Sequence, residues 1–199
     1  MRVIAGALRN RALKAPATQD IRPTSDRLRE SLFNILVHRF PESLRGKRTL
    51  DLFAGTGALG IEALSRGATS LVAVEQDRAV AKLLQANVEH AGFADRTRVV
   101  VQPAQRAVAQ LPDGDSFDLV LVDPPYREGL AQPVLERLAE RGLVTPDGLV
   151  LVEHARVESL AWPETWELEL ERRFGDSTIT LLRAAQPDHR SEVPTHAHH

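Results

Sequence analysis

From residue 48 onward, short apolar runs alternate with longer segments in which apolar residues recur at helical spacing. The apolar runs predict strands near 48–53, 70–75, 97–101, 117–122 and 147–153. The helical spacing predicts helices near 58–66, 78–91, 104–110 and 130–141. Strands that alternate with helices are typical of right-handed crossovers between parallel strands. The pattern therefore predicts an α/β fold of the Rossmann-like kind, with a doubly wound, mostly parallel sheet.

After Pro163 the pattern changes. Alternation of apolar and polar residues over 166–171, a turn at Gly175-Asp176 and a second apolar segment over 178–182 predict an antiparallel hairpin at the edge of the sheet. The polar residues 186–199 show no such pattern, and we expect them to form a disordered tail.

The N-terminal part follows a third pattern. Residues 2–5 and 11–14 predict a short hairpin, and a helix capped by Thr24 or Ser25 continues through about His38. We therefore expect three parts along the chain. They are a small hairpin and helix extension over 1–45, a main domain over 46–185 and the tail over 186–199.

The composition limits the classes of protein that fit. The 199 residues are 43% hydrophobic and 26% charged, which suits one buried domain with a small appendage. No apolar stretch approaches the roughly 18 residues that span a bilayer, and the first residues lack the apolar core of a signal peptide, so we expect a cytoplasmic protein. The absence of cysteine excludes disulfides and thiol nucleophiles, and we expect no metal site.

Charge is distributed unevenly along the chain. The net charge is −2, yet residues 1–48 hold 11 Lys and Arg against 4 Asp and Glu, a net of +7 that leaves −9 for residues 49–199. Such a basic segment attracts phosphate groups, and arginine suits bidentate phosphate contacts. The residues that could form this patch are Arg2, Arg9, Arg11, Lys14, Arg22, Arg27 and Arg29. The alternative is that they are solvated surface charges.

A glycine-rich loop follows the first predicted strand. Gly55, Gly57 and Gly60 form a complete G-x-G-x-x-G between a strand and a helix, and Glu75 ends the second strand. Glycine lets the backbone pass close to a ligand, and a carboxylate at this strand end can hold both hydroxyls of a ribose, so the spacing indicates an adenosine-bearing cofactor such as NAD. Asp51, just before the loop, would repel a pyrophosphate but can pair with an ammonium group, which favours S-adenosylmethionine.

The tetrapeptide Asp123-Pro124-Pro125-Tyr126 follows the fourth predicted strand. Ligands bind beyond the carboxyl ends of strands in an open α/β sheet, and in a reversed strand order this strand lies beside the first one and faces the cofactor. Asp123 and the Pro124 carbonyl can accept hydrogen bonds from an amino group, while Tyr126 offers a face on which a planar ring can stack. We therefore predict Asp123, Pro124 and Tyr126 as catalytic residues acting on a flat, amino-bearing substrate; a proline-stiffened turn is the alternative.

Four segments together resemble the RsmD family, and the resemblance extends to about residue 184. The segments are Arg2–Gly6, Ile21–Asn34, Asp51–Gly60 and Asp123–Tyr126, of which the second, with its R-P-T-x-D-R-x-R-E-x-x-F-N pattern, is the most specific. The resemblance implies a class I methyltransferase fold and an enzyme that uses S-adenosylmethionine to methylate the exocyclic N2 of one guanine in small-subunit (16S) ribosomal RNA.

Two positions depart from the family pattern. Arg9-Asn10-Arg11 stands where the family has a basic-Gly-basic turn, although Asn tolerates positive φ. Pro103 replaces a polar residue often found at the adenine contact.

The motifs and the resemblance together give a set of predicted contacts. The predicted cofactor-binding residues are Asp51, Phe53, Ala54, Gly55, Thr56, Gly57, Glu75, Gln76, Pro103, Ala104 and Asp123. The predicted RNA-binding residues are Arg9, Arg11, Arg22, Thr24, Arg27 and Arg127. The expected partner is ribosomal RNA, free or within the assembling or assembled 30S subunit, and the expected state is a monomer.

Other functions share some of these features. An amino-group methyltransferase acting on another RNA, on DNA adenine N6 or on a protein glutamine would share the fold, but those DNA and protein classes usually have Asn at the first motif position or a separate recognition domain. An NAD-dependent oxidoreductase would need a proton donor such as a Tyr-Lys pair, whereas the only tyrosine is Tyr126. A non-catalytic RNA-binding module also stays open.

Overall fold

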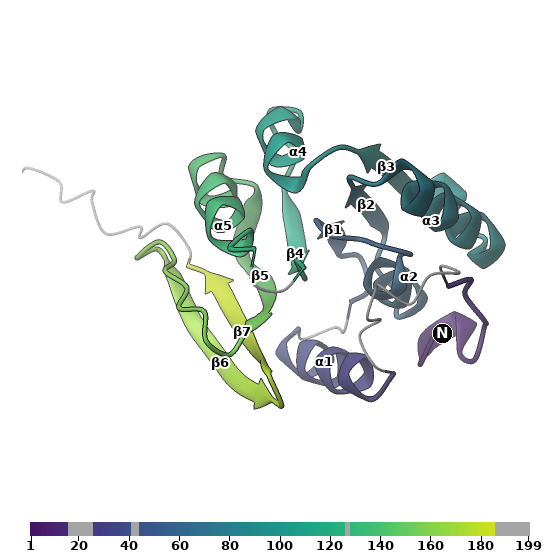
Figure 1. The fold of residues 1–199 in the computed structure, drawn as a ribbon, viewed down its shortest axis with the longest axis horizontal. Coiled ribbons are helices and arrows are strands. Elements are labelled where there is room, and N and C mark those ends of the chain that lie inside the picture. Colours follow the sequence, from purple (N-terminus) through teal and green to yellow (C-terminus); the bar gives the residue numbers. More distant parts are fainter. Residues whose placement is uncertain (16–25, 41–43, 126–127, 186–199) are drawn as a thin grey trace, which may run out of the picture.

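The computed structural model describes residues 1–15, 26–40, 44–125 and 128–185. Figure 1 shows a single sheet with helices on both of its faces. The sheet has seven strands in the order β3-β2-β1-β4-β5-β7-β6. Their bounds are β1 (Arg48–Asp51), β2 (Ser70–Glu75), β3 (Thr97–Val101), β4 (Phe117–Val122), β5 (Val144–Ala155), β6 (Trp166–Phe174) and β7 (Ser177–Ala184). The helices are η1 (Gly6–Leu8), α1 (Asp26–Arg39), α2 (Ala58–Ser65), α3 (Arg78–Ala91), η2 (Ala94–Arg96), α4 (Ala104–Gln110) and α5 (Ala131–Glu140).

The strands β1 to β5 are parallel and are joined by the helices α2 to α5. β1 pairs with β2 on one side and with β4 on the other, so the strand order reverses at β1. β3 then lies outside β2, and β5 lies beyond β4. The predicted doubly wound, mostly parallel sheet is therefore confirmed, and each of these four helices begins and ends within one residue of its predicted bounds.

Alternate residues of the central strands face opposite sides of the sheet and enter two hydrophobic clusters. Leu119 and Leu121 of β4 belong to the cluster that α1, α2 and α3 cover. Val120 and Val122 belong to the cluster beneath α4 and α5. Because both faces are buried, these strands are apolar at successive positions, which explains why the sequence presents them as continuous runs.

The predicted C-terminal hairpin is present, with its second strand on the inside. β7 pairs antiparallel with β5, and β6 pairs antiparallel with β7, so β6 forms the edge of the sheet (Figure 1). The turn between β6 and β7 places Gly175 at a φ of 60°. β5 begins at Val144 and β6 continues to Phe174, so both strands are longer than the apolar pattern indicated.

The N-terminal segment, residues 1–15, is less regular than the predicted hairpin. A single β-bridge joins Arg2 to Ala12, and the chain between them forms η1. Asn10 has a φ of 68°, in the left-handed region that asparagine tolerates. Val3 and Leu13 are buried in the cluster that also contains residues of α1 and of the sheet, so the segment packs directly on the body of the molecule.

Parts of the sequence prediction lie outside the described residues. The proposed helix caps Thr24 and Ser25 and the tail over 186–199 are among them, and α1 itself begins at Asp26. The division into an extension, a main domain and a tail stays a prediction. Within the described part of the chain, no helix combines the length and the apolar character needed to cross a membrane.

Candidate active site

The glycine loop and the Asp-Pro-Pro corner leave the sheet side by side. Asp51, the last residue of β1, lies opposite Leu121 of β4 in the parallel register. The Leu52 N–H donates to the Leu121 carbonyl at 3.0 Å, so the strands are still paired where the loop begins. Asp123, two residues after Leu121, is half-buried, and Pro124 is buried. The structure thus brings together the two motifs that the sequence singled out.

The three glycines of the loop have different roles. Gly55 has a φ of +54°, and a Cβ added there would have no atom within 4 Å, so this residue borders open space. Gly57 has a φ of +89°, and its Cβ would lie 2.5 Å from Leu84 Cδ1 of α3. At Gly60 a Cβ would lie 2.6 Å from Leu71 Cδ2 of β2. The second and third glycines therefore permit close packing, while the first leaves room for a ligand beside the backbone.

Asp51 is a buried carboxylate with an unusual environment. Its side chain is 1% exposed, and Oδ2 accepts a hydrogen bond from the Gly60 N–H at 3.1 Å. Among the described residues, Oδ1 has no hydrogen-bond partner. The pKa of Asp51 is raised to about 7, mainly by burial and to a smaller extent by the nearby Glu75 charge, against the opposing effect of the Gly60 and Phe53 backbone N–H groups. A cation placed against Oδ1 would compensate this burial, which fits the ammonium group of an amino-acid moiety.

Glu75 contacts the glycine loop itself. Oε2 accepts a hydrogen bond from the Gly55 N–H at 2.9 Å, and Oε1 accepts one from the Asp77 N–H at 2.8 Å. A carboxylate oxygen can accept a second hydrogen bond, so these contacts leave capacity for two ribose hydroxyls. Glu75 therefore shapes the loop, and its predicted contact with a ribose stays a prediction.

The residues predicted near an adenine lie at the end of β3 and the start of α4. Pro103 is exposed at the N-cap of α4, and Ala104 is 8% exposed in its first turn. Val101, the last residue of β3, is 49% exposed and adds an apolar surface that we did not predict. A signal was available, because an apolar residue that ends a strand at the ligand-binding edge is a candidate for packing against a flat ring.

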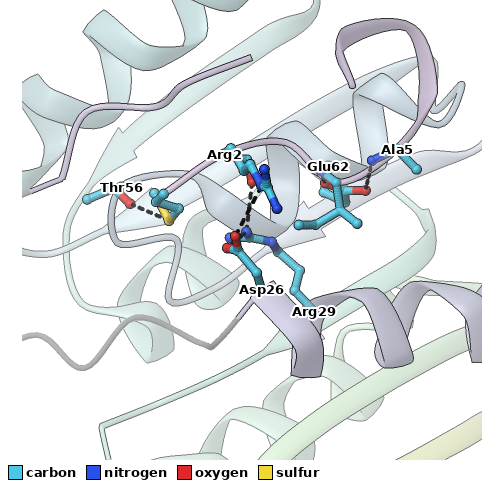
Figure 2. Close-up of polar contacts among 8 residues, drawn as sticks. Arg2, Ala5, Asp26, Arg29, Thr56 and Glu62 are labelled. Carbon is cyan, nitrogen blue, oxygen red and sulfur yellow. Dashed lines mark hydrogen bonds and ion pairs between the residues drawn. The ribbon is translucent and has the colours of Figure 1, made fainter. Parts of the chain in front are cut away.

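The basic patch predicted near the N-terminus needs a correction. Arg9 and Arg11 are exposed, and Arg11 Nη1 donates to the His90 carbonyl at 2.8 Å. Arg29, however, is fully buried and cannot be part of an exposed patch. Its Nη2 lies 2.6 Å from Asp26 Oδ1 and 2.7 Å from the Arg2 carbonyl oxygen, and Figure 2 shows it pointing toward these partners. Burial lowers the pKa of the Arg29 guanidinium, while Asp26 opposes that effect.

Several predicted site residues lie outside the described structure. For Arg22, Thr24, Tyr126 and Arg127 no placement is described, and for Arg27 only the helical backbone is. Their predicted roles in stacking and RNA binding stay predictions.

Sequence reasoning missed how the N-terminal segment is held. Glu62 of α2 is fully buried; Oε2 accepts from the Ile4 N–H at 2.7 Å, and Oε1 accepts from the Ala5 N–H at 3.0 Å (Figure 2). Arg66 Nε donates to Glu62 Oε1 at 2.7 Å. At Gly6, a Cβ would come within 1.9 Å of the Ser65 carbonyl oxygen, so the segment passes directly over α2. The available signal was that Glu62 is the one charged residue in an otherwise uncharged, mostly apolar helix.

Comparisons with known proteins agree with this geometry. Residues 1–183 match the model of a family described as Conserved hypothetical protein 95. Two similar proteins carry the name ribosomal RNA small subunit methyltransferase D. The one from Escherichia coli K12 is 38% identical over 92% of this chain and 89% of its own, and the one from Haemophilus influenzae is 35% identical over 92% and 93%. A solved structure of a putative methyltransferase from Escherichia coli superposes with a TM-score of 0.83 at 34% identity, covering 94% of this chain and 99% of that one.

Proposed function

The chain belongs to the family described as Conserved hypothetical protein 95. On that premise we propose that it transfers a methyl group from S-adenosylmethionine to the exocyclic N2 of a guanine in small-subunit (16S) ribosomal RNA. The observation that carries this proposal is the pairing of β1 with β4, which sets the glycine loop beside Asp123 and Pro124 at one edge of the sheet. The names of the two similar methyltransferases support ribosomal RNA as the class of substrate.

The residues at the glycine loop suit S-adenosylmethionine, which when bound supplies a methyl group activated on a sulfonium sulfur. Asp51 pairs with the ammonium group through Oδ1, the buried oxygen for which the described residues provide no partner. Gly55, which has open space beside it, lets the cofactor approach the backbone. Glu75 accepts hydrogen bonds from the ribose, and Val101 packs against the adenine together with Pro103.

The corner after β4 prepares the amino group for transfer. The lone pair of the guanine N2 is delocalised into the ring, so the nitrogen is a poor nucleophile. Asp123 and the Pro124 carbonyl accept its two N–H bonds, which turns the lone pair out of the ring plane and toward the methyl group. Bound S-adenosylmethionine would supply the methyl group from its sulfonium, so that the N–C bond would form as the S–C bond breaks and the sulfur would leave with the electron pair as a neutral thioether. The surplus proton then leaves the nitrogen, with the Asp123 carboxylate as its acceptor.

The remaining parts of the proposal concern RNA and its setting. The guanine leaves its stack to enter the site, and Tyr126 stacks on it. Arg9, Arg11, Arg22, Arg27 and Arg127 contact phosphates, with Thr24 beside them. The enzyme acts as a monomer in the cytoplasm on ribosomal RNA, free or within the 30S subunit.

A methylation assay with labelled S-adenosylmethionine and ribosomal RNA tests the function. The expected product after digestion to nucleosides is N2-methylguanosine, whereas N6-methyladenosine would identify a different amino-group methyltransferase. No transfer with intact cofactor binding would favour an RNA-binding module instead.

The Asp123→Ala variant tests the catalytic corner. We expect turnover to fall roughly a hundredfold while cofactor affinity stays close to that of the wild type, because Asp123 orients the substrate amine. Asp95→Ala, at an exposed position in η2, is the control. An equal loss of turnover and cofactor affinity would contradict the assignment of Asp123.

A further inference from the structure

Asn87 of α3 is a buried amide that joins two segments far apart in the sequence. The side chain has no exposed surface. Its Nδ2 donates to the Thr56 carbonyl at 2.9 Å and to the Lys14 carbonyl at 3.0 Å, and its Oδ1 accepts from the Lys14 N–H at 2.8 Å. Thr56 lies in the glycine loop, and Lys14 is in the N-terminal segment. One side chain thus binds the backbone of both.

The glycine loop is held from two directions. On the sheet side, the Glu75 carboxylate fixes the Gly55 N–H at 2.9 Å. On the α3 side, Asn87 fixes the Thr56 carbonyl at 2.9 Å. The Thr56 hydroxyl also lies 3.9 Å from the sulfur of Met1, a contact that Figure 2 draws from Thr56 to the N-terminal segment. The loop is therefore linked to the N-terminal segment in two ways, by the contact with Met1 and through the Asn87 side chain that also binds Lys14.

The chemistry at residue 87 requires an amide. Asn supplies two N–H donors and an acceptor on one short side chain, and all three groups are used here. Asp has nearly the same shape, but its carboxylate would face the carbonyl oxygens of Thr56 and Lys14 with no proton to share. Asn87→Asp is therefore a shape-preserving change that reverses two of the three contacts.

We propose that Asn87 is a positioning residue through which docking of the N-terminal segment sets the conformation of the glycine loop, so that cofactor affinity depends on that segment. The inference rests on the proposed binding of S-adenosylmethionine at this loop. By linkage, RNA that holds the basic N-terminal segment in its docked position tightens the binding of the cofactor, and the cofactor favours the docked segment to the same degree.

Two variants test the link through its backbone contacts. Lys14→Pro removes the N–H that donates to Asn87 Oδ1, whereas Lys14→Ala removes the charge and keeps that N–H. Asn87→Asp changes the other side of the contact, and Gln85→Ala, an exposed position on the same helix, is its control. The readout is the dissociation constant of S-adenosylmethionine, measured by calorimetry without RNA.

We expect Asn87→Asp and Lys14→Pro each to weaken cofactor binding roughly five- to a hundredfold, the range for losing buried hydrogen bonds and for coupling between sites. The double variant should lose little more than either single one, because both changes break the same link. Lys14→Ala and Gln85→Ala should bind like the wild type. Circular dichroism and thermal melts establish whether the variants are folded. If Asn87→Asp does not fold, Lys14→Pro, which changes an exposed residue, still tests the link.

Wild-type affinity in both variants, additive losses in the double variant, or an equal loss in Lys14→Ala would each overturn the proposed coupling. Failure of the wild type itself to bind S-adenosylmethionine would instead overturn the proposed function.

Discussion

Replacement of Asp51 by Asn should change how stability depends on pH. Burial raises the pKa of Asp51 from 3.8 to about 7 in the folded protein. Between these two values the folded state binds more protons at this site than the unfolded state does, so the contribution of Asp51 to stability falls as the pH rises and levels off above pH 7. At 1.36 kcal/mol per pKa unit, ionising the buried carboxyl costs about 4 kcal/mol in total, of which about 2 kcal/mol falls between pH 5 and pH 7, where half of the folded molecules still hold the proton.

Asn keeps the shape of Asp and can still accept the hydrogen bond from the Gly60 N–H, but it does not ionise. Its amide group would take the place of Oδ1, where the described residues offer no partner, at a cost of about 1–3 kcal/mol. We therefore expect the Asp51→Asn protein without cofactor to become more stable relative to the wild type by about 2 kcal/mol from pH 5 to pH 7. Above pH 7 the variant should be the more stable of the two.

Urea unfolding, followed by tryptophan fluorescence at several pH values, measures this difference. Other titrating groups are common to both proteins and cancel when the two free energies of unfolding are subtracted. If the difference stays constant from pH 5 to pH 8, the raised pKa of Asp51 is refuted. Cofactor binding gives a second readout. Near pH 6.5 the wild type should release a proton as the ammonium group docks against Asp51, and Asp51→Asn should bind weakly and release none.

Three further changes test other parts of the structure. Glu62→Ala should lower the free energy of unfolding by about 2–4 kcal/mol, because it leaves the Ile4 and Ala5 N–H groups and Arg66 without their acceptor. Glu62→Gln should lower it by less. Equal stability of the wild type and both variants in chemical denaturation would contradict this role. Gly55→Ala should cost about 1 kcal/mol of stability, from its φ of +54° alone, and should weaken cofactor binding. Gly57→Ala should cost more, because its Cβ would also lie 2.5 Å from Leu84 Cδ1. Thermal melts and calorimetry separate the two outcomes. Removing the charges of Arg9 and Arg11 together should weaken RNA binding and lower the slope of its salt dependence by about two, roughly one for each phosphate contact that is lost. An unchanged salt slope in filter binding would refute their contact with phosphates.

The sheet and its helices could be predicted from the sequence because their apolar patterns are local. Strands such as β4, which are buried on both faces, appear as unbroken apolar runs, and α3 matches its predicted bounds at both ends. The pairing of β1 with β4 could be predicted as well, since right-handed crossovers leave few arrangements for alternating strands and helices.

The contacts that hold the N-terminal segment could not be predicted, because they join residues distant in sequence. Glu62 contacts Ile4 and Ala5, and Asn87 contacts Lys14, but no local pattern marks these pairs. The same limit explains the wrong interpretation of Arg29. Its charge suggested an exposed position, whereas the packing of α1 buries it beside Asp26. Charge alone does not indicate burial when a partner is supplied by the tertiary fold.

The inner position of β7 has a consequence for synthesis of the chain. β5 pairs with β4 on one side, and its other side is completed only by β7, the last strand along the described chain. While a ribosome is still translating residues before 177, the nascent protein has an open, apolar strand edge at Val150 and Leu151. A chain that terminates early at this point would keep that edge and pair with other copies. Synthesis of β7 is thus the step that closes this edge of the sheet.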